Sequence, residues 1–256
     1  MNVLSKILRK ITKLRLHPIR VLCFHNVSEV YNPLTTWECD WTQIDQFKKS
    51  IKEIKRQGYT FISLTEAYEK LKHDWVRCEK YVVLTADDGY KSILNILPWL
   101  DEQQIPVTVF INTKYLDGKS WSAINEEQAR RAKPDVDMLT EVCPDLYISK
   151  KELFALTSSY LEIGMHGHEH EHLDATKQNP DEFRMNVEQC RDVLKQHPRY
   201  VPFFAYAWGR HNRETDEMLT KMGLVPLLVN GMLNYTFTGY INRQAIDGKT
   251  IGEYLL

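Results

Sequence analysis

The sequence lacks any run near the roughly 20 apolar residues that span a bilayer, so it predicts no transmembrane helix. It also lacks a strong net charge: the formal value is −1 over 256 residues, which argues against a nucleic-acid partner attracted by bulk charge. Its five cysteines are odd in number and include no Cys-x-x-Cys pair, a poor basis for a disulfide framework or a thiolate metal site. With 43% hydrophobic and 26% charged residues, the chain has the composition of an ordinary globular protein.

Residues 1–20 differ from the rest, because they carry six basic side chains and no acidic one. Their apolar residues recur at helical spacing from Leu4 to Leu14, without the continuous apolar core or cleavage site of a signal peptide. This basic amphipathic segment could lie on an anionic membrane or pack against the domain formed by residues 21–256. We therefore expect a cytoplasmic protein, with peripheral membrane contact through residues 1–20 as one of the two alternatives.

Short apolar runs alternate with helical patterns along the remainder of the chain, which predicts an α/β fold with parallel strands in one domain. Most runs are continuously apolar, as in strands that are covered on both faces. Either a barrel or an open doubly wound sheet fits this number of strands. Residues 117–147 break the rhythm and are interpreted as an insertion over one end of the sheet. The predicted strands are 21–26, 61–64, 81–88, 107–112, 161–166, 203–208 and 224–230.

Four of these strands end in polar or reactive side chains, and the carboxyl ends of parallel strands meet on one face. His25 ends the first, Asp87 and Asp88 end the third, His166 ends the fifth, and Trp208 ends the sixth. The agreement between four strands predicts a functional site at that face.

The paired carboxylates and a histidine series are the strongest of these signals. Asp87 and Asp88 precede a glycine, which fits either a turn that closes a strand or a pair in which one carboxylate binds a divalent metal and the other accepts a proton. Four histidines follow at alternate positions from 166 to 172. Two of them, His166 with His170 or His168 with His172, could complete a three-ligand site with positions left open for water and substrate.

Together these residues resemble the motifs of the polysaccharide deacetylases, the family with the NodB homology domain. Thr-Ala-Asp-Asp-Gly-Tyr at 85–90 is similar to the first motif, and Glu-Ile-Gly-Met-His-Gly-His-Glu-His at 162–170 to the second. Phe-Ala-Tyr-Ala-Trp-Gly at 204–209 is similar to a variant of the third, and 21–27 to the opening Tyr-His-x-Val. The order and spacing of these motifs also agree, over about residues 21–246.

The resemblance implies a distorted (β/α) barrel that removes acetyl groups from N-acetylated sugars with one divalent metal ion. By position, Asp88, His166 and His170 are the expected metal ligands, and Asp87 is the base that activates water on the metal. The backbone N–H of Trp208 is expected to help stabilise the oxyanion. Zinc is the first choice of metal, while cobalt, nickel and iron suit the same ligands.

The sequence also departs from the family pattern. Members often take their general acid from a late Leu-x-His motif, but no histidine follows His211. Ala205 stands where the third motif commonly has an arginine that orients the catalytic aspartate. His25, His168 or a recycled Asp87 could supply the acid. Two further alternatives stay open at this point: an amidohydrolase for a small non-sugar amide, and a carbohydrate-binding relative without activity.

Overall fold

The computed structural model describes residues 17–31, 41–73, 79–117, 146–170 and 179–246, and its centre is a closed ring of parallel strands. Neighbouring strands pair in the order β1-β10-β9-β8-β7-β6-β5, and β5 pairs again with β1. The predicted barrel is therefore confirmed. Its strands are β1 (Arg20–Phe24), β5 (Lys80–Ala86), β6 (Val107–Ile111), β7 (Leu161–Met165), β8 (Tyr200–Ala205), β9 (Val225–Val229) and β10 (Ile241–Ala245).

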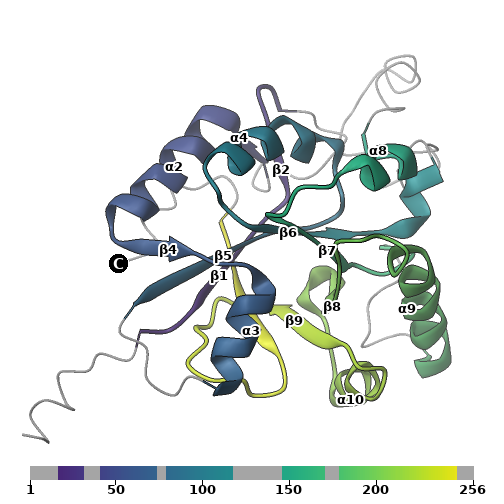
Figure 1. Ribbon diagram of the computed structural model, residues 1–256. Coiled ribbons are helices and arrows are strands. Elements are labelled where there is room, and N and C mark those ends of the chain that lie inside the picture. The colour runs from purple at the N-terminus through teal and green to yellow at the C-terminus, as the bar shows by residue number, and fades with distance from the viewer. Residues whose placement is uncertain (1–16, 32–40, 74–78, 118–145, 171–178, 247–256) are drawn as a thin grey trace, which may run out of the picture.

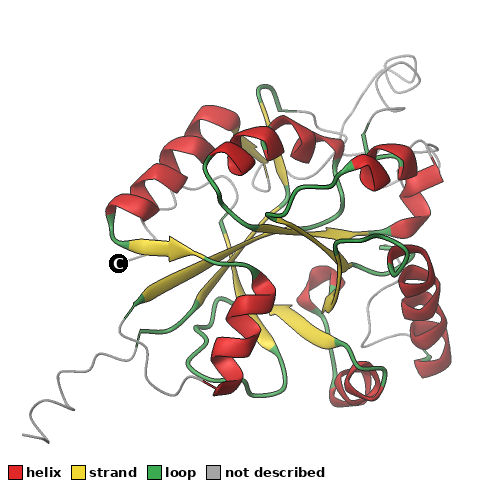
Figure 2. Ribbon diagram, in the orientation of Figure 1, coloured by secondary structure: helices red, strands yellow, loops and turns green. Residues whose placement is uncertain are grey.

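Helices surround the ring of strands (Figures 1 and 2). They are α2 (Ile44–Arg56), α3 (Leu64–His73), α4 (Leu97–Glu102), α8 (Lys150–Ala155), α9 (Pro180–Leu194) and α10 (Arg213–Lys221), with the 3-10 turns η2 (Lys91–Asn95), η3 (Thr113–Asp117) and η5 (Ala207–Gly209). A short strand, β4 (Tyr59–Phe61), pairs with the first residues of β5 outside the ring. A separate small sheet pairs β2 (Asn26–Ser28) with β3 (Trp41–Gln43). Among the described residues, no helix is long and apolar enough to cross a membrane.

The strands bury both faces, because successive side chains of a strand point to opposite sides. On β1, Leu22 and Phe24 join the apolar cluster that contains the inner face of α2. Val21 joins a second cluster, which includes Val83, Phe110 and other residues that face the barrel interior. Because of the same alternation, the polar residues that follow Val21 on β1 and Val83 on β5 also face the barrel interior, near the carboxyl ends of the strands.

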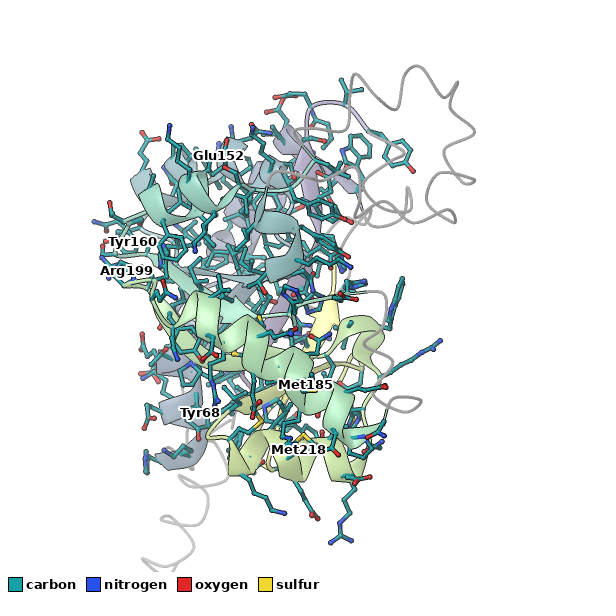
Figure 3. The ribbon with its side chains drawn as sticks, turned by 90° about the vertical axis from the view of Figure 1, so that its right-hand side faces the viewer. Tyr68, Glu152, Tyr160, Met185, Arg199 and Met218 are labelled. Atoms are coloured by element: carbon teal, nitrogen blue, oxygen red, sulfur yellow. The ribbon has the colours of Figure 1, made fainter. Side chains whose placement is uncertain are left out.

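Local signals set the ends of the helices. The Gln43 side chain accepts hydrogen bonds from the first backbone N–H groups of α2, and Ile44, Phe47, Ile51 and Ile54 form its buried stripe. On α10, Asn212 and Thr215 form a capping box. Helices α9 and α10 touch each other while they pack on β7 and β9 respectively, and Figure 3 views them face-on with Met185 and Met218 labelled. Asn186 of α9 also accepts a hydrogen bond from the backbone N–H of His168, which follows β7.

Several predicted boundaries are wrong. The predicted strand 61–64 ends at Phe61, and Leu64 begins α3. Ile93, Leu94, Leu97 and Leu100 have the apolar spacing of one helix in the sequence, but they fall in η2 and α4, with Pro98 in the first turn of α4. The predicted strand 203–208 ends at Ala205 and is followed by η5.

Two strands were not predicted at all, and one of them matters for function. Both β3 and β10 are short and polar, with the sequences Trp-Thr-Gln and Ile-Asn-Arg-Gln-Ala. Strand β10 nevertheless closes the barrel between β1 and β9. Most of the predicted insertion at 117–147, and residues 1–16 of the basic segment, lie outside the described residues.

Candidate active site

Three side chains that the sequence predicts as metal ligands meet at the carboxyl end of the barrel. The ligating atoms of Asp88, His166 and His170 all lie within 4.8 Å of one another. The Nε2 atom of His166 is 3.1 Å from Asp88 Oδ1, and Nε2 of His170 is 3.3 Å from the same oxygen. One carboxylate oxygen is thus the meeting point of two imidazole rings.

A tight turn after β5 sends the two adjacent carboxylates in different directions. The backbone N–H of Asp87 still bonds to the Phe24 carbonyl of β1. Asp88 and Gly89 then adopt left-handed backbone conformations, with φ of 69° and 71°. A Cβ on Gly89 would lie 3.0 Å from the Ile111 side chain, so glycine suits the position for space as well as for conformation. Because of this turn, the Asp88 side chain points to the two histidines, whereas the Asp87 side chain points into the barrel interior.

Backbone contacts determine which nitrogen His166 presents. Its Nδ1 atom lies 2.9 Å from the carbonyl oxygen of Ala205. Because a carbonyl can only accept, Nδ1 carries the proton in the neutral ring and Nε2 keeps its lone pair. Such support of the second ring nitrogen is the usual arrangement behind a metal-bound histidine. Ala205, which replaces the arginine of the family motif, thereby still contributes through its backbone.

His170 lies between His166 and Trp208, with ring centroids 5.1 and 4.9 Å away. Burial lowers the pKa of His170 to about 4, although the Asp88 carboxylate opposes that shift. The ring is therefore neutral near pH 7, which is the form that ligates metals.

The donor set fits a divalent cation. Asp88 Oδ1 is buried without a hydrogen-bond donor, and each of the two nitrogens that face it offers a lone pair when its ring is neutral. A buried negative oxygen among such acceptors needs a positive partner. Two imidazoles and one carboxylate suit zinc and similar ions, and they leave coordination positions for water and substrate.

Asp87 has a different partner, which the sequence analysis missed. Arg243 of β10 is completely buried and donates from both terminal nitrogens to the two Asp87 oxygens, at 2.6 and 2.8 Å. Burial alone would raise the pKa of Asp87, but the charge of Arg243, followed by that of His166, holds the pKa at about 2. Asp87 is therefore ionised and fixed in orientation near pH 7.

Arg243 is itself held by its surroundings. Its Nη1 donates to the Thr85 hydroxyl at 3.3 Å, and that hydroxyl donates to the Leu22 carbonyl at 2.9 Å. The guanidinium carbon lies 5.3 Å from the ring centroid of Phe110. The arginine expected in the third motif is thus replaced by one from another strand. The only feature of the sequence that could have indicated Arg243 is that a buried aspartate needs a cationic partner.

The remaining predicted residues are divided between the site and its edge. His25 offers a ring nitrogen within 4.8 Å of the Asp87 carboxylate. Trp208 has a left-handed backbone, φ 59°, and the residue is 57% exposed, with its ring beside His170. His168 turns its Nδ1 to the Thr113 hydroxyl at 2.9 Å and does not join the three-ligand cluster. Its rival partner His172 lies outside the described residues.

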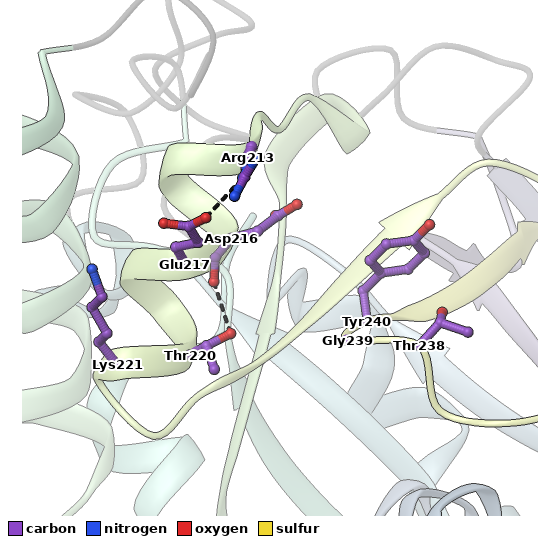
Figure 4. A pocket seen from close by; sticks show the side chains of 8 residues that line it. All are labelled: Arg213, Asp216, Glu217, Thr220, Lys221, Thr238, Gly239 and Tyr240. Carbon is purple, nitrogen blue, oxygen red and sulfur yellow. Dashed lines mark hydrogen bonds and ion pairs between the residues drawn. The ribbon is translucent and has the colours of Figure 1, made fainter.

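A pocket of about 380 Å³ lies elsewhere, between α10 and the segment before β10 (Figure 4). Asp216 lines it and also accepts the Tyr206 hydroxyl, while the ring of His211 lies 2.9 Å from its other oxygen. The pocket contains none of the predicted metal ligands or Asp87. We therefore place the candidate active site at the strand ends and not in this pocket.

The sequence model of the family named "Polysaccharide deacetylase" matches residues 76–227, which include Asp87, Asp88, His166 and His170. The chain belongs to the polysaccharide deacetylase family. Its members are hydrolases of N-acetyl amide bonds, so the chain is a hydrolase that acts on carbon–nitrogen bonds. Arg243 lies outside the matched segment.

Solved structures have the same fold. IcaB from Ammonifex degensii is 18% identical with a TM-score of 0.73, and the match covers 93% of this chain and 95% of that one. The deacetylase PplD from Streptococcus pyogenes, in complex with acetate, is 20% identical with a TM-score of 0.72, covering 93% and 96%. A de-N-acetylase from Aggregatibacter actinomycetemcomitans is 17% identical with a TM-score of 0.70, covering 92% and 99%. No curated protein matches the chain significantly.

Proposed function

We propose that this polysaccharide deacetylase hydrolyses the N-acetyl group of a glycan or glycolipid intermediate with one divalent metal ion, preferably zinc. The observation that carries the proposal is the division of labour between two adjacent carboxylates. Asp88 faces two imidazole nitrogens, whereas Asp87 is ionised, paired with Arg243 and outside the ligand cluster. A base beside a metal site is what hydrolysis of an amide by water requires.

Asp88, His166 and His170 would hold the ion. When bound, it would polarise the acetyl carbonyl and make a neighbouring water more acidic. Asp87 accepts the proton of the attacking water as the water oxygen bonds to the carbonyl carbon. Arg243 keeps the carboxylate ionised and aimed during this step.

The second half of the reaction breaks the carbon–nitrogen bond and releases acetate and the sugar amine. The backbone N–H of Trp208 is proposed as a hydrogen-bond donor to the oxyanion that forms first. The leaving nitrogen needs a proton, and His25 is the histidine next to Asp87 that could supply it. His168 is bonded to Thr113 instead, so its position does not support that role.

Acetate release from a panel of N-acetylated oligosaccharides and small non-sugar amides tests this proposal. We expect release from sugars only, loss of release on treatment with a chelator, and recovery with zinc or cobalt. Release from the small amides alone would overturn the sugar specificity. Undiminished release from protein shown by elemental analysis to be metal-free would overturn the metal dependence.

We also propose that residues 1–20 hold the enzyme at the cytoplasmic surface of a membrane, where a lipid-linked sugar would meet it. The support is the five basic residues before Pro18 without an acid among them, each of which contributes about 1 kcal/mol near an anionic surface. The sixth base, Arg20, lies in β1 and donates to Tyr59 and Gln244. The full chain should sediment with anionic vesicles, and less so in high salt. A variant that begins at Pro18 should stay in the supernatant. Equal behaviour of the two proteins would refute the proposal.

A further inference from the structure

A second group of metal-ligating side chains lies beside the three-ligand cluster. Cys23, His25 and Asp87 each offer one ligating atom, and these atoms all lie within 4.8 Å of one another. Cys23 and Asp87 are buried, while His25 is partly exposed, which leaves a side open to solvent. Sulfur, nitrogen and oxygen ligands together suit zinc and softer divalent ions such as cadmium.

The barrel geometry creates this group. Cys23 and His25 are two residues apart and therefore share one face of the chain that leaves β1. Where β1 pairs with β5, Cys23 lies opposite Thr85 and Phe24 lies opposite Ala86. The residues that come next on the two strands, His25 and Asp87, are therefore neighbours. The consecutive residues Asp87 and Asp88 thus each belong to a different three-ligand group.

The pairing with Arg243 weakens metal binding by Asp87 without preventing it. Arg243 takes one lone pair from each Asp87 oxygen. A carboxylate has about four lone-pair positions, so one remains on each oxygen for a metal ion. The guanidinium repels an incoming cation, but it lies close enough to Cys23 for the two to interact electrostatically, and a neighbouring arginine generally favours the thiolate form that ligates metals. The group that contains Asp88 has no such cation bonded to its carboxylate oxygens among the described residues.

We propose that Cys23, His25 and Asp87 form a second, weaker site for a thiophilic divalent ion, and that occupation of this site inhibits the enzyme. The Cys23 thiol releases its proton to solvent when its sulfur ligates the ion. Inhibition rests on the proposed function, because the ion then occupies the lone pairs with which Asp87 accepts a proton and the nitrogen with which His25 would donate one. Activity should therefore rise with the first equivalent of zinc and fall at higher concentration.

Cobalt distinguishes the two sites by their absorption spectra, because only the second site contains a sulfur ligand. The metal-free full-length protein is titrated with Co²⁺ and its near-ultraviolet sulfur-to-cobalt charge-transfer absorption is recorded. We expect the first equivalent to bind without this absorption and further equivalents to produce it. Cys23→Ser and Cys23→Ala should lack the absorption. The zinc concentration that halves activity should rise by at least about 10–100-fold, the range typical for loss of a group that only supports a metal ligand.

Cys190 provides the matched control within the described residues. It is also buried and outside any disulfide, but its sulfur lies 3.6 Å from the Ile111 carbonyl, and burial raises its pKa to about 12. Cys190→Ala should therefore keep the cobalt–sulfur absorption. The absence of the absorption in the wild type, or its persistence in both Cys23 variants, would overturn the proposed site. Zinc inhibition unchanged in both Cys23 variants would overturn the inhibitory role.

The variant Asp88→Asn separates this proposal from the proposed function. It should lose acetate release, yet gain the sulfur absorption with the first equivalent of cobalt, because the second site is intact. If the wild type shows the absorption but releases acetate from no substrate, the metal site stands and the proposed function fails. If the wild type releases acetate but never shows the absorption, the function stands and the second site fails.

Discussion

Asp87 and Asp88 are consecutive, both carboxylates are buried, and both have a lowered pKa, yet the group that lowers the pKa most differs between them. Burial would raise the pKa of each, and different partners reverse that effect. For Asp87 the largest opposing influence is Arg243, a cation built into the fold. For Asp88 it is His170, whose own pKa is lowered to about 4 and which is therefore neutral near pH 7.

The difference shows how one fold separates two tasks. A carboxylate that already has an arginine on both oxygens is oriented and charged, and it is suited to proton transfer rather than to tight metal binding. A carboxylate oxygen without a donor, among imidazole nitrogens, is suited to a cation that the chain does not provide. Exchanging or removing these partners one at a time tests this separation.

The largest effect is expected from the isosteric variants of the two aspartates. Asp87→Asn cannot accept a proton, and removal of a general base typically costs about 10²–10⁴-fold in rate, so turnover should fall that far while one metal ion stays bound. Asp88→Asn should lose the metal ion of the Asp88–His166–His170 site as well as the activity, and any metal that it retains should be the weakly bound ion of the Cys23–His25–Asp87 site. Metal content by elemental analysis and initial rates of acetate release check both expectations. Near wild-type turnover of Asp87→Asn would show that Asp87 is not the base.

Arg243→Gln should have the next largest effect. Breaking a buried ion pair by removing one partner typically costs about 3–5 kcal/mol, because the remaining charge stays buried without compensation. Arg243→Lys is the matched control, since it keeps the charge but not the two-point contact, and it should recover part of both stability and kcat. Denaturant unfolding and steady-state kinetics give the two values. A wild-type stability for Arg243→Gln would mean that the pair contributes nothing.

The same variant predicts a pH dependence with a definite sign. In the wild type the pKa of Asp87 is about 2, below the ordinary value of 3.8, so the pair stabilises the fold above about pH 4 and loses this contribution as the pH falls through 2. Without Arg243, burial raises the pKa of Asp87. The stability deficit of Arg243→Gln should therefore be largest near pH 7 and shrink toward pH 4, and the acid limb of kcat/KM should move to higher pH. A deficit independent of pH would indicate a packing defect instead.

The sequence predicts those parts of the fold and of the site whose pattern lies within a short stretch of the chain. Most barrel strands are apolar runs bounded by turns, and Asp87, Asp88 and His166 fall at strand ends, so these features were accessible from the pattern. The choice of His170 over the rival pair, and of a barrel over an open sheet, came from the family resemblance. Arg243 was not accessible. It lies in a strand that is too polar to stand out, and its partner is 156 residues away. Only the closed ring, in which β10 lies beside β1 and β1 beside β5, brings the two charges together.

The smallest effect concerns the packing beneath Arg243. A Cβ on Gly164 would lie 2.4 Å from the ring of Phe110, the aromatic residue over which the guanidinium stands. Gly164→Ala should therefore destabilise the fold by about 1–3 kcal/mol, as is typical of overpacking, and lower kcat through a displaced Arg243–Asp87 pair while the metal stays bound. The double variant Gly164→Ala with Phe110→Leu removes part of the clash, so its stability should exceed the sum expected from the two single changes. Strict additivity would show that the added methyl group is accommodated without moving Phe110. In that case the orientation of the Asp87 carboxylate would depend on Arg243 alone, and not on the packing of Phe110 against the guanidinium group.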